Sequence, residues 1–249
     1  MTPHCRAVLR LADTNLVLAQ RLGEWVGHAP ALEEDLGLAN MSLDLIGQAR
    51  LLLAHAGELE GCGRDEDALA YLRAESEYLN LTLVEQPNGD FADTIVRQFL
   101  FDAWQCGVYE GLARSSDATL AAIAAKGHAE AAYHLRYSGG WLERLGDGTP
   151  ESHARAARSL ANLWPFVSEL FVDDEVDRAV AEAGIAPLPS SLEKAWSVRV
   201  DATLSAATLA RPAPAPFAWY GKQGRHSEHL GYLLAEMQSL HRAHPGATW

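Results

Sequence analysis

The pair of side chains best placed for metal chemistry is Glu130 and His134, in the run Glu130-Ala131-Ala132-Tyr133-His134. Residues four apart share one face of a helix, so this spacing brings a carboxylate and an imidazole together. Long helix bundles use such pairs in carboxylate-bridged di-iron or di-manganese centres. These centres take a Glu from each of two helices and a Glu-x-x-His from each of the other two. The match here is partial, because the motif has a spacing of three.

A second ligand-bearing helix should supply the other half of such a centre. The nearest counterpart is the run Leu43–Arg50, which contains Asp44 and Gln48 but no histidine. Two pairs and one acidic run also have spacings that a metal can use: His226 with His229, His241 with His244, and Asp173-Asp174-Glu175 with Asp177. We expect these histidines to lie at helix ends near backbone carbonyls, and the acidic run to form a solvated face.

Composition narrows the classes of function. The 249 residues carry 33 acidic and 20 basic side chains, a net charge of −13, which repels phosphate backbones and anionic lipid. We therefore expect no nucleic-acid partner and no membrane. Cys5, Cys62 and Cys106 are widely spaced, which predicts reduced thiols and a cytoplasmic location. The chain has no Gly-x-Gly-x-x-Gly, Gly-Lys-Ser/Thr or Gly-x-Ser-x-Gly motif, so the usual signs of nucleotide binding and acyl transfer are missing.

Helices must position these side chains, because Ala and Leu dominate the composition and no useful alternating run appears. We predict an all-α fold, an up-down helix bundle whose interior holds any site. Glycine and proline punctuation places helices at about 6–26, 30–60, 65–84, 91–114, 117–145, 150–183, 190–209 and 227–242.

One predicted helix, over about 30–60, has apolar residues at steps of three, four and seven. This spacing predicts the stripe that faces the core of the bundle. Its members are Leu32, Leu36, Ala39, Leu43, Ile46 and Leu53.

The proline-rich stretch Arg211–Pro216 predicts an extended connector. The segment after it is too short for a core of its own. We expect one domain over 1–249, with a tail helix of about 221–249 docked on it.

Eight runs along the chain resemble the C-subunit family of phenylacetyl-CoA 1,2-epoxidase, a multicomponent bacterial monooxygenase of aerobic phenylacetate catabolism. The resemblance covers essentially the whole chain. The runs are Leu18–Trp25, Gly27–Pro30, Leu43–Arg50, Val84–Gly89, Tyr133–Arg136, Gly140–Gly146, His229–Gly231 and Leu234–Gln238.

The resemblance implies a ferritin-like bundle in a non-catalytic structural subunit. That subunit would brace a homologous A subunit, which carries the di-iron centre and epoxidises phenylacetyl-CoA. A small bridging B subunit and a reductase that supplies electrons complete the set of partners. The resemblance implies no cofactor in this chain.

The resemblance also indicates what stands at the ligand positions of the A subunit. Leu45 and Gln48 occupy one Glu-x-x-His, and Ala131 replaces the Glu before His134. Asn15 replaces a third Glu, and Asp102 lies near the last carboxylate position. Two ligands of six cannot hold two divalent ions, so we predict no di-metal centre.

A polar remnant is expected instead. We expect Asp44, Gln48, Asp102, Glu130 and His134 to point inward and to hydrogen-bond with one another. The alternatives are a single adventitious metal held by His134 and a carboxylate, or a working di-metal site. With the latter, the chain would be a free-standing ferritin-like oxidase or metal-binding protein. A third possibility is an adaptor bundle with no enzyme partner.

The resemblance also points to two segments as candidates for contact with the CoA moiety. They are Glu77-Tyr78-Leu79-Asn80 and Arg178-Ala179-Val180. Tyr78 and Asn80 have groups that can hydrogen-bond an adenine or an amide, and Arg178 can face a phosphate. The alternative interpretation is ordinary helix surface.

We expect Arg21 and Trp25 to lie at the partner interface, since these residue types are enriched at hot spots. Arg21→Glu or Trp25→Asp should then abolish heteromer formation without unfolding the chain.

Overall fold

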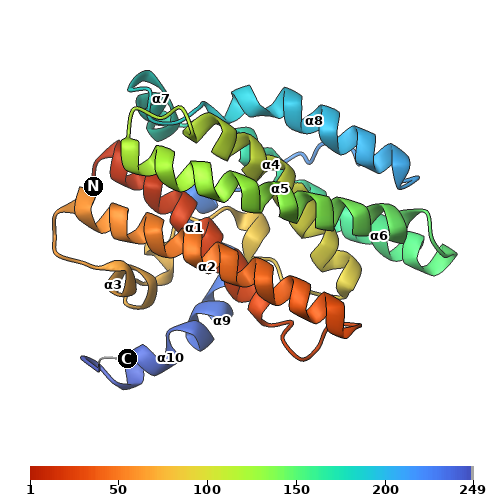
Figure 1. The fold of residues 1–249 in the computed structure, drawn as a ribbon, viewed down its shortest axis with the longest axis horizontal. Coiled ribbons are helices and arrows are strands. Elements are labelled where there is room, and N and C mark those ends of the chain that lie inside the picture. The colour runs from red at the N-terminus through yellow and green to blue at the C-terminus, as the bar shows by residue number, and fades with distance from the viewer. Residues whose placement is uncertain (248–249) are drawn as a thin grey trace. The chain divides into compact units, whose positions relative to one another are not determined.

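The computed structural model describes residues 1–247, which divide into two compact units (Figure 1). Unit 1 is Met1–Pro87 with Tyr220–Trp249, and unit 2 is Asn88–Trp219. All regular elements in the described part of the chain are helices, apart from one isolated bridge between Tyr220 and Arg225. The predicted all-α class is therefore confirmed.

Unit 1 is built on a long antiparallel pair, α1 (Pro3–Gly23) and α2 (Leu32–Glu60). Asn15 Nδ2 donates to Gln48 Oε1, and Ser42 Oγ donates to the carbonyl of Ala19. The numbers of the contacting residues thus increase along α1 while they decrease along α2, so the two helices are antiparallel. The shorter elements are α3 (Glu66–Tyr71), η1 (Glu75–Glu77), η2 (Thr82–Glu85), η4 (Gly221–Gln223), α9 (Glu228–Met237) and α10 (Ser239–Ala243).

Unit 2 is built on a second antiparallel pair, α4 (Phe91–Leu112) and α5 (Ala118–Gly146). Gly127 of α5 lies against the ring of Tyr109, and Gly139 lies against Phe99, so these two helices also run in opposite directions. The remaining elements are α6 (Pro150–Leu163), η3 (Trp164–Phe171), α7 (Glu175–Glu182) and α8 (Pro189–Ala206). Two antiparallel pairs in succession, joined by a long connection, form the helix order of the ferritin-like fold.

The helix predicted over 65–84 is not continuous. The α3 helix ends at Tyr71, and the chain then runs through two short 3-10 turns with extended backbone at Tyr78. A buried carboxylate causes the break, because Asp13 of α1 pairs with Arg73 and accepts from the backbone N–H of Leu79 at 2.9 Å.

The helix predicted over 150–183 is also broken. Pro165 has no N–H to donate, so α6 stops at Leu163 and the chain continues as η3. Asp174 then caps α7, where its Oδ1 accepts from the N–H of Asp177. The acidic run is therefore the start of a helix and not the solvated middle of one, and Asp177 is buried.

The tail forms two helices, which belong to unit 1. The α9 helix packs against α1, η1 and η2, and the helix is interrupted at Gln238. The amide of Gln238 donates to the carbonyl of Arg73 at 3.1 Å. The connector Arg211–Pro216 forms no helix, as predicted, while positions 248 and 249 of the expected tail lie outside the described residues.

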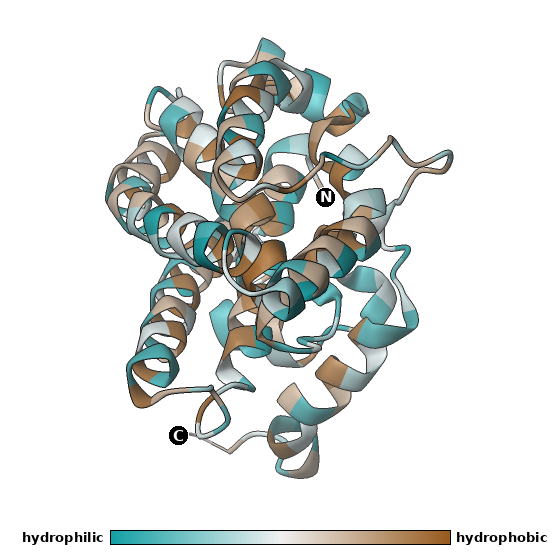
Figure 2. Cartoon of the chain, turned by 90° about the vertical axis from the view of Figure 1, so that its right-hand side faces the viewer, coloured by the Kyte–Doolittle hydropathy of each residue, from teal (hydrophilic) through white to brown (hydrophobic). Residues whose placement is uncertain are grey.

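Most of the predicted apolar stripe of α2 faces solvent, so the prediction that it faces the core is wrong there and correct only for Leu53, which is 2% exposed. The core side of α2 carries Leu38, Met41, Leu45 and Leu52, all fully buried. Hydrophobic and hydrophilic residues are interspersed along the helices (Figure 2). On α2, apolar residues lie both in the core and at the surface. Four stripe residues are exposed by the following fractions: Leu32 72%, Leu36 56%, Leu43 64% and Ile46 38%.

Across residues 1–247, no helix combines the length and the apolar character that crossing a bilayer requires.

Two glycines of α2 should respond oppositely to the same substitution. A Cβ at Gly57 would lie 2.3 Å from the backbone carbonyl oxygen of Arg64, whereas nothing lies within 4 Å of one at Gly47. We expect Gly57→Ala to lower the free energy of unfolding by about 1–3 kcal/mol through overpacking. Gly47→Ala should raise it by about 0.5–1 kcal/mol, because alanine favours the helix. Urea denaturation of both variants checks this, and equal effects would contradict the packing of Arg64 on α2.

Candidate functional site

The positions carried over for metal ligands on α1 and α2 are buried and do not offer metal ligands. Asn15 and Gln48 are hydrogen-bonded to each other, with 3.2 Å between Asn15 Nδ2 and Gln48 Oε1. Leu45, fully buried on the same face of α2 as Gln48, has no donor atom at all. These three residues therefore do not fit a di-metal centre, which needs carboxylates here to neutralise two cations.

On α4 and α5 the corresponding positions hold Asp102, Ala131 and His134, all with no exposed surface. Asp102 accepts two hydrogen bonds, from Ser138 Oγ at 2.7 Å and from Gln98 Nε2 at 2.7 Å. Burial raises the pKa of Asp102 to about 6, although His134 and the two hydrogen bonds favour its charged form.

Two of the five polar residues expected inside are only half-buried, namely Asp44 and Glu130. The Glu130 carboxylate lies 3.7 Å from Lys126 Nζ on the surface of α5. The i,i+4 spacing of Glu130 and His134 therefore does not bring both side chains into the interior. The fully buried polar residues of unit 2 include Gln98, Asp102, His134 and Ser138.

Unit 1 contains a buried carboxylate that the sequence analysis missed, Glu85 of η2. Its side chain has no exposed surface and accepts from Asn80 Nδ2 at 2.9 Å, from the N–H of Ser227 at 2.5 Å and from His226 Nδ1 at 2.9 Å. The sequence signal that could have identified Glu85 was its position just before the turn Gln86–Gly89. A buried carboxylate at the end of a short helix needs hydrogen-bond donors.

His226 is the partner of Glu85 and not half of a metal-binding pair. Its second ring nitrogen, Nε2, lies 2.8 Å from the carbonyl oxygen of Tyr78. Both ring nitrogens thus face acceptors, and only the doubly protonated imidazolium can donate to both. Burial opposes that charge, but the hydrogen bond and charge of Glu85 outweigh it and raise the pKa of His226.

Arg21 belongs to the same network, so the expectation that it lies on a partner-facing surface is wrong. Its guanidinium donates to the carbonyl of Glu85 at 2.8 Å and to that of His229 at 3.2 Å. The side chain is 9% exposed. Arg21→Glu would place a carboxylate against two carbonyls and would destabilise unit 1, while Trp25 is half-buried.

The segment carried over for CoA contact is largely buried. The Tyr78 hydroxyl donates to the carbonyl of Ala70, and Asn80 Nδ2 donates to Glu85, so the donor groups of both are engaged inside unit 1. Leu79 and Val180 are buried, Ala179 is half-buried, and Glu77 and Arg178 are exposed. Contact with CoA stays a prediction that rests on Glu77 and Arg178.

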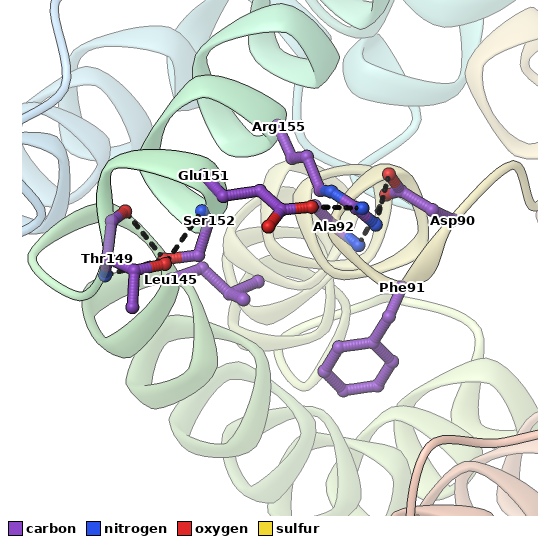
Figure 3. Close-up of a pocket in the computed structure, with 8 residues that line it drawn as sticks. All are labelled: Asp90, Phe91, Ala92, Leu145, Thr149, Glu151, Ser152 and Arg155. Carbon is purple, nitrogen blue, oxygen red and sulfur yellow. Dashed lines mark hydrogen bonds and ion pairs between the residues drawn. The ribbon is translucent and has the colours of Figure 1, made fainter.

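A pocket of about 340 Å³ lies at the starts of α4 and α6 (Figure 3). Arg155 points between Glu151 and Asp90, with its guanidinium 3.6 Å from the Asp90 carboxylate. Asp90 and Thr149 also cap the two helices. The polar groups of this pocket neutralise and cap one another, so their arrangement is structural.

Asp102 should make stability depend on pH. Its carboxyl has a usual pKa of 3.8 when unfolded and about 6 when folded, so the folded chain binds more protons between these values. Stability is therefore lost as pH rises through that window. Asparagine does not ionise, so the Asp102→Asn variant does not lose this stability as pH rises. The unfolding free energy of the variant minus that of the natural chain should therefore rise by about 2–3 kcal/mol from pH 4 to pH 7.5. Guanidinium denaturation at both pH values measures this.

The matched control is Glu130→Gln, the same chemical change at a half-buried carboxylate of α5. A stability difference for Asp102→Asn that does not change with pH would show that Asp102 is not buried as described.

The His226–Glu85 pair should change stability with pH in the same sense as Asp102, because folding raises the pKa of His226 as well. Because the pKa of His226 is raised by folding, its contribution is complete below the unfolded value of 6.5 and is lost as pH rises through the folded value. We expect His226→Gln to cost most stability at pH 6 and progressively less at pH 8 and above. Thermal unfolding at a series of pH values tests this, with His28→Gln, at an exposed histidine, as the control.

Comparisons with known proteins place the chain in a family. The family model for "Phenylacetic acid catabolic protein" matches residues 1–249. The chain is 54% identical over 241 residues to a protein of Escherichia coli (strain K12) that is named as the C subunit of 1,2-phenylacetyl-CoA epoxidase, and the match covers 97% of each. This chain therefore belongs to the phenylacetic acid catabolic protein family.

Proposed function

We propose that this chain is the non-catalytic structural subunit of a phenylacetyl-CoA epoxidase, the component that corresponds to the C subunit of the Escherichia coli relative. That relative matches nearly the full length of the chain. The observation that carries the non-catalytic assignment is chemical: Asn15, Leu45 and Gln48 hold an amide pair and a hydrocarbon where a di-metal bundle needs carboxylates and an imidazole.

These substitutions let each helix pair form without a metal. The Asn15 amide donates to the Gln48 amide oxygen, and Leu45 and Ala131 contribute buried apolar surface. Asp102 has two neutral donors and a raised pKa, so it is compatible with a site that holds no cation. A bundle of this kind supports a partner and does not itself activate oxygen.

In this proposal the chemistry belongs to a homologous A subunit, which holds the di-iron centre and epoxidises phenylacetyl-CoA. A reductase supplies the electrons, and a small bridging B subunit joins the complex. This chain braces the A subunit, and the exposed groups of Glu77 and Arg178 are its candidates for contact with the CoA moiety. No observation in the described residues favours the alternative of a free-standing di-metal oxidase.

The direct test is the metal content of the chain. Purified alone from iron-replete cells, it should carry well below one iron per chain by emission spectroscopy, because two ligands cannot hold two ions. The matched control is the homologous A subunit prepared in the same way, which should retain iron. About two irons per copy of this chain would overturn the assignment. Failure to co-purify with the A subunit after co-expression would remove the proposed structural role.

A further inference from the structure

The exposed stripe of α2 has the geometry of a second packing seam. Its members follow one another at steps of four, three, four, three and four residues, which is the spacing of a heptad seam. They lie on the side of α2 opposite Leu38, Met41 and Leu45, which fill the core. In order, the seam consists of Leu32, Leu36, Ala39, Leu43, Ile46 and, at its end, Arg50.

The core of unit 1 does not account for this seam. Leu32, Leu36 and Leu43 are each more than half exposed, although leucine is a residue that folding normally buries. Scattered exposed apolar residues need no explanation, but a continuous row along one helix marks a surface that binds another protein. A row at heptad spacing fits one further helix, whose side chains would interdigitate with it.

The charges beside the seam indicate the kind of helix that fits. Residues 31–50 contain four acidic residues, Glu33, Glu34, Asp35 and Asp44, and one basic residue, Arg50, at the end of the seam. A second copy of this chain would bring the same four carboxylates to the contact, and each copy carries a net charge of −13. Repulsion therefore disfavours self-association, and a helix with basic residues beside its own apolar row is favoured.

We propose that the outer seam of α2, Leu32 to Arg50, is the docking surface for one amphipathic helix of the catalytic A subunit, with basic residues flanking that helix. This rests on the proposed function, because that function supplies the partner. The apolar row provides affinity through burial, and the acidic flanks set the partner's orientation and exclude a second copy.

The experiment compares two variants that add the same carboxylate at equally exposed apolar positions. Leu43→Glu lies at the middle of the seam, and Val198→Glu lies on α8 in unit 2, where the side chain is 66% exposed. Each variant is first tested for co-purification with a co-expressed A subunit. The affinity of the separately purified variant for the separately purified A subunit is then measured by titration calorimetry. We expect Leu43→Glu to weaken binding at least tenfold and Val198→Glu to change it less than threefold. Both variants should keep the melting temperature of the natural chain, because neither position lies in the core.

A second arm tests the charges. Glu33→Lys should weaken binding of the A subunit several-fold, and added salt should weaken binding of the natural chain more than that of the Glu33→Lys variant.

The outcomes separate the two proposals. If the natural chain does not bind the A subunit, the proposed function fails and the seam loses its partner. If the natural chain binds but Leu43→Glu binds equally well, the function stands and the seam is not the docking surface. A homodimer of the natural chain that Leu43→Glu dissociates in sedimentation would overturn the choice of a catalytic partner.

Discussion

The structure depends on α2, a helix that is apolar on two opposite sides. A helix in a soluble protein usually has one apolar face against the core and one polar face toward water. The inner face of α2 packs within unit 1, whereas its outer row of leucines has no cover within residues 1–247. A chain that carries this row in water is exposed to non-specific association unless a partner covers it. The need for a partner is therefore present in the primary structure of this single helix.

In the proposed function, the same helix belongs to a bundle that folds without a metal. Removing single ligands would leave carboxylates buried without a counter-charge, which is costly. Here the changes on α1 and α2 are consistent with one another, because an amide donates to an amide and a leucine fills space. The isolated carboxylate on α4, Asp102, is accommodated differently, by two neutral donors and a raised pKa. The two helix pairs thus provide hydrogen-bond partners for these buried groups in different ways.

Much of this arrangement was predictable, and the errors have physical causes. Most boundaries of the long helix pairs follow from glycine and proline punctuation, whereas the number of helices does not, because three predicted helices are interrupted. The break after Tyr71 was not predictable from local sequence, because the ion pair of Asp13 with Arg73 joins segments far apart in the chain. The break at Pro165 had a local signal, the missing N–H. Periodicity gave the spacing of the α2 stripe correctly but not its direction, since a row at heptad steps fits a core and a partner equally well.

The buried Glu85 explains why the tail belongs with α1 and not with the connector that precedes it. A fully buried carboxylate needs several donors, and those available to Glu85 include the backbone of Ser227 and the ring of His226. Arg21, which sequence reasoning placed at an interface, serves the same purpose through the carbonyls of Glu85 and His229. Unit 1 thus combines an apolar core with buried directional contacts of charged residues, while a further row of apolar residues on α2 is exposed. In the proposed function, the buried contacts fix the fold of unit 1 and the exposed apolar row is available to another chain.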